Sequence, residues 1–200
     1  MEKEQIIKCS AKIFKKQGFK NVKMDDLATN LSISKKTFYQ HFQNKIELIS
    51  YCQEYLFDDF LAEMELKVNN EKEKENKAKI TIVVSQFVDF IDGLDQKAVL
   101  DLEDDKICKK MTKEFITQFK NYVTASFISE NDLNHKKSFD FITTLFIESV
   151  ISFKLKTTDF GEIKTELKST FIDLFIVNFF EQQNKETLFE SLLRKNKKNI

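Results

Sequence analysis

The sequence contains no proline, no tryptophan and only three glycines in 200 residues. Sheets and long ordered loops need turn residues that are rare here, whereas helices do without them. Hydrophobic residues make up 42% of the chain, enough to supply a core, and phenylalanine alone occurs 21 times. The composition therefore predicts an all-α protein and does not predict disorder over most of the chain.

The residue types that most often perform catalysis or bind metals are also scarce. The three cysteines lie far apart at Cys9, Cys52 and Cys108, and there are only two histidines, so no zinc or iron–sulfur spacing exists. Unpaired cysteines at such spacing indicate buried packing in a reducing compartment. No Gly-rich phosphate loop and no Ser-His-Asp set is visible. We therefore expect a protein that is not an enzyme and that needs no cofactor.

No apolar run approaches the roughly 20 residues that cross a bilayer. The N-terminus leads directly into an amphipathic helix and does not resemble a signal peptide. These two features predict a soluble, cytoplasmic protein with no membrane partner.

The formal net charge of zero conceals an uneven distribution of charge. Residues 1–47 carry ten lysines against five acidic residues, and residues 194–198 add four positive charges, so residues 48–193 carry about −9. A basic N-terminal segment on an acidic body suits a partner that presents phosphates at one end only.

Residues 23–45 (KMDDLATNLSISKKTFYQHFQNK) predict two short helices that meet at a tight turn. The first helix has an apolar stripe at i, i+3, i+4, i+7 spacing, formed by Met24, Leu27, Ala28 and Leu31. Ser34 is a good N-cap for the second helix, which buries Phe38 and Phe42. Its other face is polar. This pattern is typical of a helix-turn-helix whose second helix enters the DNA major groove.

The chemistry of this second helix indicates which residues read bases. Lys35, Lys36 and Thr37 lie at its N-terminal end, where recognition helices meet base edges. Gln40 can pair bidentately with adenine, and lysine can donate to guanine. His41 suits either helix packing or a DNA contact.

Residues 34–42 (SKKTFYQHF) and 44–48 (NKIEL) together resemble the signature of TetR/AcrR-type transcriptional regulators. The resemblance covers roughly residues 4 to 50 and includes Phe14, the Gly18-Phe19 turn and residues 24–28 (MDDLA). The resemblance implies that Tyr39 and Lys45 bind phosphates of the DNA backbone. The family usually has Ser or Thr, which caps the helix, where this chain has Lys23. The cap is therefore lost, but we still expect the Lys23 side chain to contact a phosphate.

The rest of the chain predicts further helices, with residues 1–47 as the DNA-binding domain and residues 48–200 as a ligand-binding and dimerisation domain. Asn44 and Glu47 form a capping pair for a long helix that ends near Lys67, and residues 68–79 are the best loop candidate. Further helices are expected over residues 79–94, 96–102, 104–128, 138–156 and 159–182. Asp159 and Glu162 are expected to form another cap pair, and residues 187–193 a short terminal helix.

The last two long helices are apolar on more than one side. A surface helix needs one apolar stripe, so the second face is either central in the bundle or buried against a second subunit. We expect a homodimer, because a protein that binds a two-fold symmetric DNA site must hold its two DNA-binding domains about one helical turn apart. The residues expected at this interface are Phe141, Leu145, Ile151, Ile172, Ile176, Phe179 and Phe180.

The middle helices offer many phenylalanines and few polar groups that would be buried. Such a lining suits a small hydrophobic ligand, and the family resemblance implies an inducer site in this region. Each position taken alone is better explained as ordinary core. The candidate lining residues are Phe57, Phe60, Met64, Phe87, Phe90, Phe115, Phe119, Tyr122, Phe146 and Phe153.

The sequence thus predicts a sequence-specific regulator that binds a palindromic site in double-stranded DNA as a homodimer and responds to a hydrophobic effector. Repression is the usual role in the family. The alternative is a helical dimeric ligand-binding or interaction module that does not bind DNA. It is kept open by two departures from the family pattern, Lys23 and Lys36, the second at a position where relatives often have Gly or Ala.

Overall fold

The computed structural model describes residues 1–71, 76–128 and 133–181. Within these ranges the chain forms nine α-helices and no strand, which confirms the all-α prediction. No helix in these ranges combines the length and apolar character needed to cross a bilayer. The helices are α1 (Lys3–Gln17), α2 (Met24–Asn30), α3 (Lys35–His41), α4 (Lys45–Asn70), α5 (Asn76–Asp92), α6 (Gln96–Asp104), α7 (Lys106–Phe127), α8 (Leu133–Lys156) and α9 (Phe160–Phe175), followed by a π-helical segment, Ile176–Glu181.

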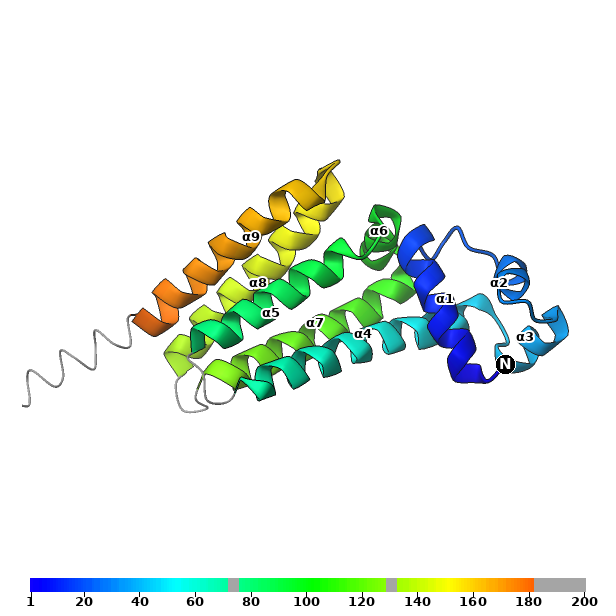
Figure 1. Ribbon diagram of the computed structural model, residues 1–200, viewed down its shortest axis with the longest axis horizontal. Coiled ribbons are helices and arrows are strands. Elements are labelled where there is room, and N and C mark those ends of the chain that lie inside the picture. Colours follow the sequence, from blue (N-terminus) through cyan, green and yellow to red (C-terminus); the bar gives the residue numbers. More distant parts are fainter. Residues whose placement is uncertain (72–75, 129–132, 182–200) are drawn as a thin grey trace, which may run out of the picture.

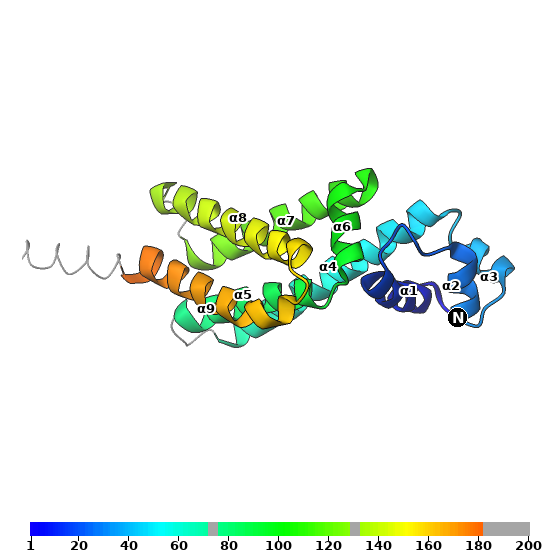
Figure 2. The ribbon, with the colours of Figure 1, turned by 90° about the horizontal axis from the view of Figure 1, so that it is seen from above.

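Helices α1–α3, which we call the head, lie together at one end of the long helix α4, and helices α4–α9 form the body (Figure 1). Seen from above, α7 and α8 lie along one side of the body and α5 and α9 along the other (Figure 2). Phe14, Phe38 and Phe42 are fully buried in the head. The ammonium of Lys3 lies 3.7 Å from the ring centroid of Tyr51, which joins the start of α1 to α4.

The helix starts follow the capping signals in the sequence in two of three cases. Ser34 Oγ accepts a hydrogen bond from the Thr37 amide at 3.0 Å, and Asn44 Oδ1 accepts one from the Glu47 amide at 2.9 Å. Asp159 makes no side-chain cap hydrogen bond, so the expected cap pair at α9 is wrong. Its backbone (φ −128°, ψ 87°) departs from the extended conformation of the other two caps, in which a short side chain faces the next turn.

The turn between α2 and α3 has the geometry of a helix C-terminal motif. Ser32 adopts a positive φ of 55°, and the Ile33 amide donates to the Ala28 carbonyl at 3.0 Å. This bond returns across the last turn of α2 and ends the helix. Half-buried Ile33 packs against the hydrophobic core.

Several predicted boundaries differ from the observed ones. Helix α4 continues to Asn70 and α5 begins at Asn76, so helix covers much of the predicted loop 68–79. The last helix is α-helical only to Phe175, where the π-helical segment begins. The predicted terminal helix 187–193 lies outside the described residues.

Two of the three cysteines are part of the core. Cys52 and Cys108 are buried, whereas Cys9 is partly buried. Burial raises the pKa of both buried thiols, that of Cys108 to about 12, because a thiolate would lose its hydration there. Protonated thiols act as small apolar groups, in agreement with the packing role expected from the sequence.

Asp101 of α6 connects the body to the head. Its Oδ2 accepts hydrogen bonds from the backbone amides of Phe19 at 2.6 Å and Lys20 at 2.8 Å, in the loop after α1. The residue is only 5% exposed. A Cβ at Gly18, whose φ is +79°, would lie 2.9 Å from the same carboxylate oxygen. Glycine therefore allows both the backbone conformation and the close approach of α6.

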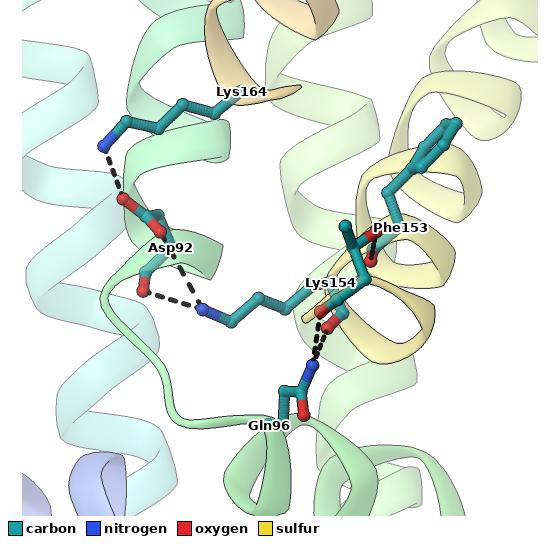
Figure 3. Close-up of polar contacts among 6 residues, drawn as sticks. Asp92, Gln96, Phe153, Lys154 and Lys164 are labelled. Carbon is teal, nitrogen blue, oxygen red and sulfur yellow. Dashed lines mark hydrogen bonds and ion pairs between the residues drawn. The ribbon is translucent and has the colours of Figure 1, made fainter. Parts of the chain in front are cut away.

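The opposite end of α6 is held by a second polar junction, shown in Figure 3. Gln96 Nε2 donates to the carbonyls of Lys154 (3.0 Å) and Thr157 (2.7 Å) at the end of α8. The Lys154 ammonium in turn donates to the Asp92 carbonyl at 3.0 Å, and Lys164 of α9 donates to the Asp92 carboxylate at 2.6 Å. The N-terminus of α6 is thus tied to the ends of α5 and α8, while Asp101 ties the same short helix to the head.

We expect Asp101→Ala to lower the free energy of unfolding by about 2–4 kcal/mol, because it leaves two amides without their charged acceptor in a buried site. Asp104→Ala is the matched control, since Asp104 is exposed on the same helix, and it should change stability by less than about 0.5 kcal/mol. Urea unfolding followed by circular dichroism measures both. Equal stabilities of the two variants would contradict the role given to Asp101.

Candidate nucleic-acid interface and effector region

Helix α3 separates an apolar side from a polar side. Phe38 is completely buried, and its ring packs against that of Phe42 at a centroid distance of 5.6 Å. The residues expected to contact DNA lie on the remaining surface of the head. Exposed among them are Lys23, Ser34, Lys35, Lys36, Tyr39 and Gln40, while Thr37, His41 and Lys45 are partly buried.

The N-terminal end of α3 is tied to the first turn of α2 by charge. The Lys35 ammonium lies 2.5 Å from Asp25 Oδ2, and the Tyr39 hydroxyl donates to Asp25 Oδ1 at 3.4 Å. The hydrogen bond from Lys35 holds the pKa of Asp25 below its usual value, and Asp25 raises the pKa of Lys35. Two of the residues expected to contact DNA therefore share one acidic partner, a relation that the sequence pattern did not reveal.

Lys45 is positioned by the loop that also binds Asp101. Its ammonium donates to the carbonyl of Lys20 at 2.6 Å, and partial burial lowers its pKa. An ammonium group has three donors, so Lys45 keeps two for another acceptor. The loop after α1 thus holds both the body, through Asp101, and the start of α4, through Lys45.

The body residues expected to line an effector pocket form a closed ring cluster, which we define by Phe57, Phe60, Phe87, Phe90, Phe115, Phe119 and Phe146. Phe57 stacks on Phe115 at a centroid distance of 4.1 Å, and Phe87 on Phe119 at 4.9 Å. Met64 is fully buried, Tyr122 is partly buried, and Phe153 is 45% exposed and lies apart from the cluster. The sequence pattern therefore found mostly core, although Phe60 and Phe90 also line a small hollow of about 270 Å³.

A groove of about 510 Å³ opens elsewhere, between α6, α7 and α8. None of the ten candidate pocket residues lines it. Its walls are aliphatic and lysine-rich, and we call it the lysine groove; its principal lining residues are Leu102, Ile116, Ile147, Ile151 and Leu155 with Lys109, Lys113, Lys120 and Lys156. No group of three or more His, Cys, Asp or Glu side chains suited to a metal ion occurs in the described part of the chain.

The residues expected at a dimer interface are divided between surface and core. Phe141 is 68% exposed and Leu145 is 43% exposed, whereas Ile172 and Ile176 are partly buried and Ile151 lines the lysine groove. Phe179 is 1% exposed and packs on Phe139 of its own chain, so it has no surface left to offer a second subunit. The side chain of Phe180 lies outside the described residues.

The geometry of the head is that of a helix-turn-helix, and known proteins contain similar segments. Residues 6–52 match the sequence model of the bacterial regulatory proteins of the tetR family. The chain therefore carries a segment similar to that family's sequence model, in agreement with the resemblance stated from the sequence.

Three similar proteins illustrate the relationship. The uncharacterized HTH-type transcriptional regulator YerO of Bacillus subtilis (strain 168) is 33% identical over 98 residues, which span 47% of this chain but only 33% of that protein. A transcriptional regulator from Rhodococcus sp. Rha1 has a TM-score of 0.70 at 12% identity and covers 91% of this chain and 97% of its own. The regulator FadR of Bacillus subtilis, solved in complex with stearoyl-CoA, has a TM-score of 0.61 at 14% identity, covering 86% and 98%.

We expect Asp25→Asn to release Lys35, so that one more lysine becomes available to phosphates. The slope of log affinity against log salt concentration should then become steeper by about one. Asp26→Asn removes the same charge from the neighbouring residue and is the control for a general electrostatic effect. Fluorescence anisotropy of labelled duplex DNA at several salt concentrations measures both slopes. If the two variants have the same slope, the Lys35–Asp25 pair does not limit DNA binding.

Proposed function

We propose that the chain binds a palindromic operator as a homodimer, with α3 of each subunit in the major groove, and that a small hydrophobic effector alters this affinity. The observation that carries the proposal is the polar outer face of α3, which is backed by buried Phe38 and Phe42. Repression is the expected outcome, since a dimer seated on a promoter blocks other proteins. Such a protein works in the compartment that holds the DNA, the cytoplasm.

The proposed contacts with DNA fall into two groups. Lys35, Lys36, Thr37 and Gln40 face base edges, because they occupy the exposed side of α3 and its N-terminal end. A second set positions the helix on phosphates or supports it, and consists of Lys23, Ser34, Tyr39, His41 and Lys45. The net positive charge of residues 1–47 supports this assignment.

We place the subunit interface on α8 and α9. Phe141 and Leu145 are large apolar side chains that a single chain leaves exposed, and exposed apolar surface of this kind marks interaction sites. Residues 1–47 then form the DNA-binding domain and residues 48–200 the domain that dimerises and binds the effector. A two-fold dimer predicts two half-sites related by the same symmetry.

Selection of bound fragments from random duplex DNA by the purified protein tests this function. We expect a palindrome, and an affinity that falls steeply with salt because several lysines displace counterions. Failure to enrich any sequence at low salt, with a folded protein, would favour a helical interaction module that has lost DNA binding.

Lys45→Ala should weaken binding to all sequences alike and reduce the salt slope by about one, because Lys45 is proposed to contact a backbone phosphate and not a base. Gln40→Ala should instead relax the preference at one base position and cost about 1–3 kcal/mol on the preferred site only. Competition assays on matched and mutated operators separate the two effects. Lys77→Ala, in the first turn of α5, is the control, because this end of α5 lies away from the head (Figure 1).

Phe141→Lys should produce monomers, because a charged side chain would have to be buried at the proposed interface. We expect the dimer dissociation constant to rise at least about tenfold and operator affinity to fall with it. Sedimentation velocity measures the oligomeric state. Leu66→Lys on α4 is the matched control, since Leu66 is 62% exposed and lies outside the proposed interface; loss of dimer in the control alone would place the interface elsewhere.

A further inference from the structure

The floor of the lysine groove is suited to an aliphatic chain. Ile147 is buried, and Ile116, Ile151 and Leu155 are partly exposed along the groove. None of the described residues that line it is aromatic. Its volume of about 510 Å³ falls within the roughly 300–1,000 Å³ typical of small-molecule sites.

The rim of the lysine groove is positively charged. Four lysines line it against two glutamates, Glu103 and Glu148. Lys120 pairs with Asp140 at 2.9 Å and donates to Thr144 Oγ1. Lys109, Lys113 and Lys156 have no carboxylate within ion-pair distance among the described residues, and all three are exposed. Three cations beside an aliphatic floor are complementary to a molecule that carries an anionic group on an apolar chain.

We propose that the lysine groove binds an aliphatic carboxylate, with the chain along the isoleucines and the carboxylate at Lys109 and Lys113. Its role as the regulatory site rests on the proposed function, but binding itself does not. The ring cluster is filled by its own side chains, so a ligand there would have to displace stacked rings. The groove is open without any such movement.

A second subunit is a less suitable occupant of the groove. Among the described side chains of α8, the large apolar ones left exposed are Phe141, Leu145 and Phe153, and none of these three lines the groove. A protein partner would instead have to bury the exposed lysines of the rim, at a cost in desolvation. The carboxylate of a small molecule neutralises a lysine and leaves the rest of the rim in water.

The groove also reaches the contact between body and head. Leu102 and Glu103 line it and directly follow Asp101, whose carboxylate binds the loop after α1. A ligand that displaces this turn of α6 moves Asp101 and, through its hydrogen bonds, the loop after α1 that carries Phe19 and Lys20. The same short helix thereby links an occupied groove to the orientation of the head.

Isothermal titration calorimetry with dodecanoate, dodecyltrimethylammonium and dodecanol, each below its micellar concentration, tests the site without DNA. We expect one dodecanoate per chain, and at least about tenfold weaker binding of the cation, because its charge is repelled by the rim. Lys113→Glu should weaken dodecanoate binding about three- to tenfold. Lys110→Glu, three residues away on α7 and outside the groove, should leave it within about twofold.

Ile116→Trp adds a test of the floor, because the larger side chain fills the groove. It should weaken dodecanoate binding at least about tenfold while the circular dichroism spectrum stays unchanged. Equal binding of dodecanoate and the cation, equal effects of the substitutions at 110 and 113, or unchanged affinity in folded Ile116→Trp would overturn the proposal. Dodecanoate binding by a protein that selects no DNA would refute the proposed function but would still support the proposed carboxylate site in the lysine groove.

Discussion

The orientation of the head on the body depends on the two hydrogen bonds that the loop after α1 donates to the Asp101 carboxylate. This carboxylate is nearly buried, so the bonds are made where water cannot replace them. Gln96, one turn earlier on α6, binds the last carbonyls of α8 (Figure 3). Helix α6 is therefore fixed at both ends by polar contacts and has little freedom to move independently of either neighbour. Any displacement of α6 must be shared by the head.

The two candidate effector regions differ in what a ligand must displace. The ring cluster has neighbouring centroids as close as 4.1 Å and 4.9 Å, and close-packed interiors lose many contacts when opened. The lysine groove is already formed, and its rim carries charge that an apolar core cannot offer. A preformed site binds at a lower cost of reorganisation. The groove is thus the better starting point for ligand binding, although the phenylalanine pattern points to the interior.

The parts of this structure that could be predicted from the sequence are those with local causes. Helical spacing located the helices, and caps such as Ser34 and Asn44 act within three residues of their partners. Asp101 and Phe19 are separated by 82 residues, and no spacing rule relates them. Asp159 has the right residue type for a cap, but its backbone conformation differs from that of Ser34 and Asn44 and it makes no cap hydrogen bond. Likewise, an apolar stripe marks Phe179 as buried without saying whether its own chain or a partner buries it.

The ion pair between Lys35 and Asp25 satisfies two charges on the proposed DNA-binding face of the head, and it costs little to break. The side chains of both residues are largely exposed, and an exposed ion pair contributes little stability because water screens it. In the proposed complex with DNA, a phosphate or a guanine edge would compete with Asp25 for Lys35. Asp25 then keeps the Tyr39 hydroxyl as a donor, or loses it to a second phosphate. Asp25 thus holds two side chains of the proposed DNA-binding face in place and would compete with DNA for both of them.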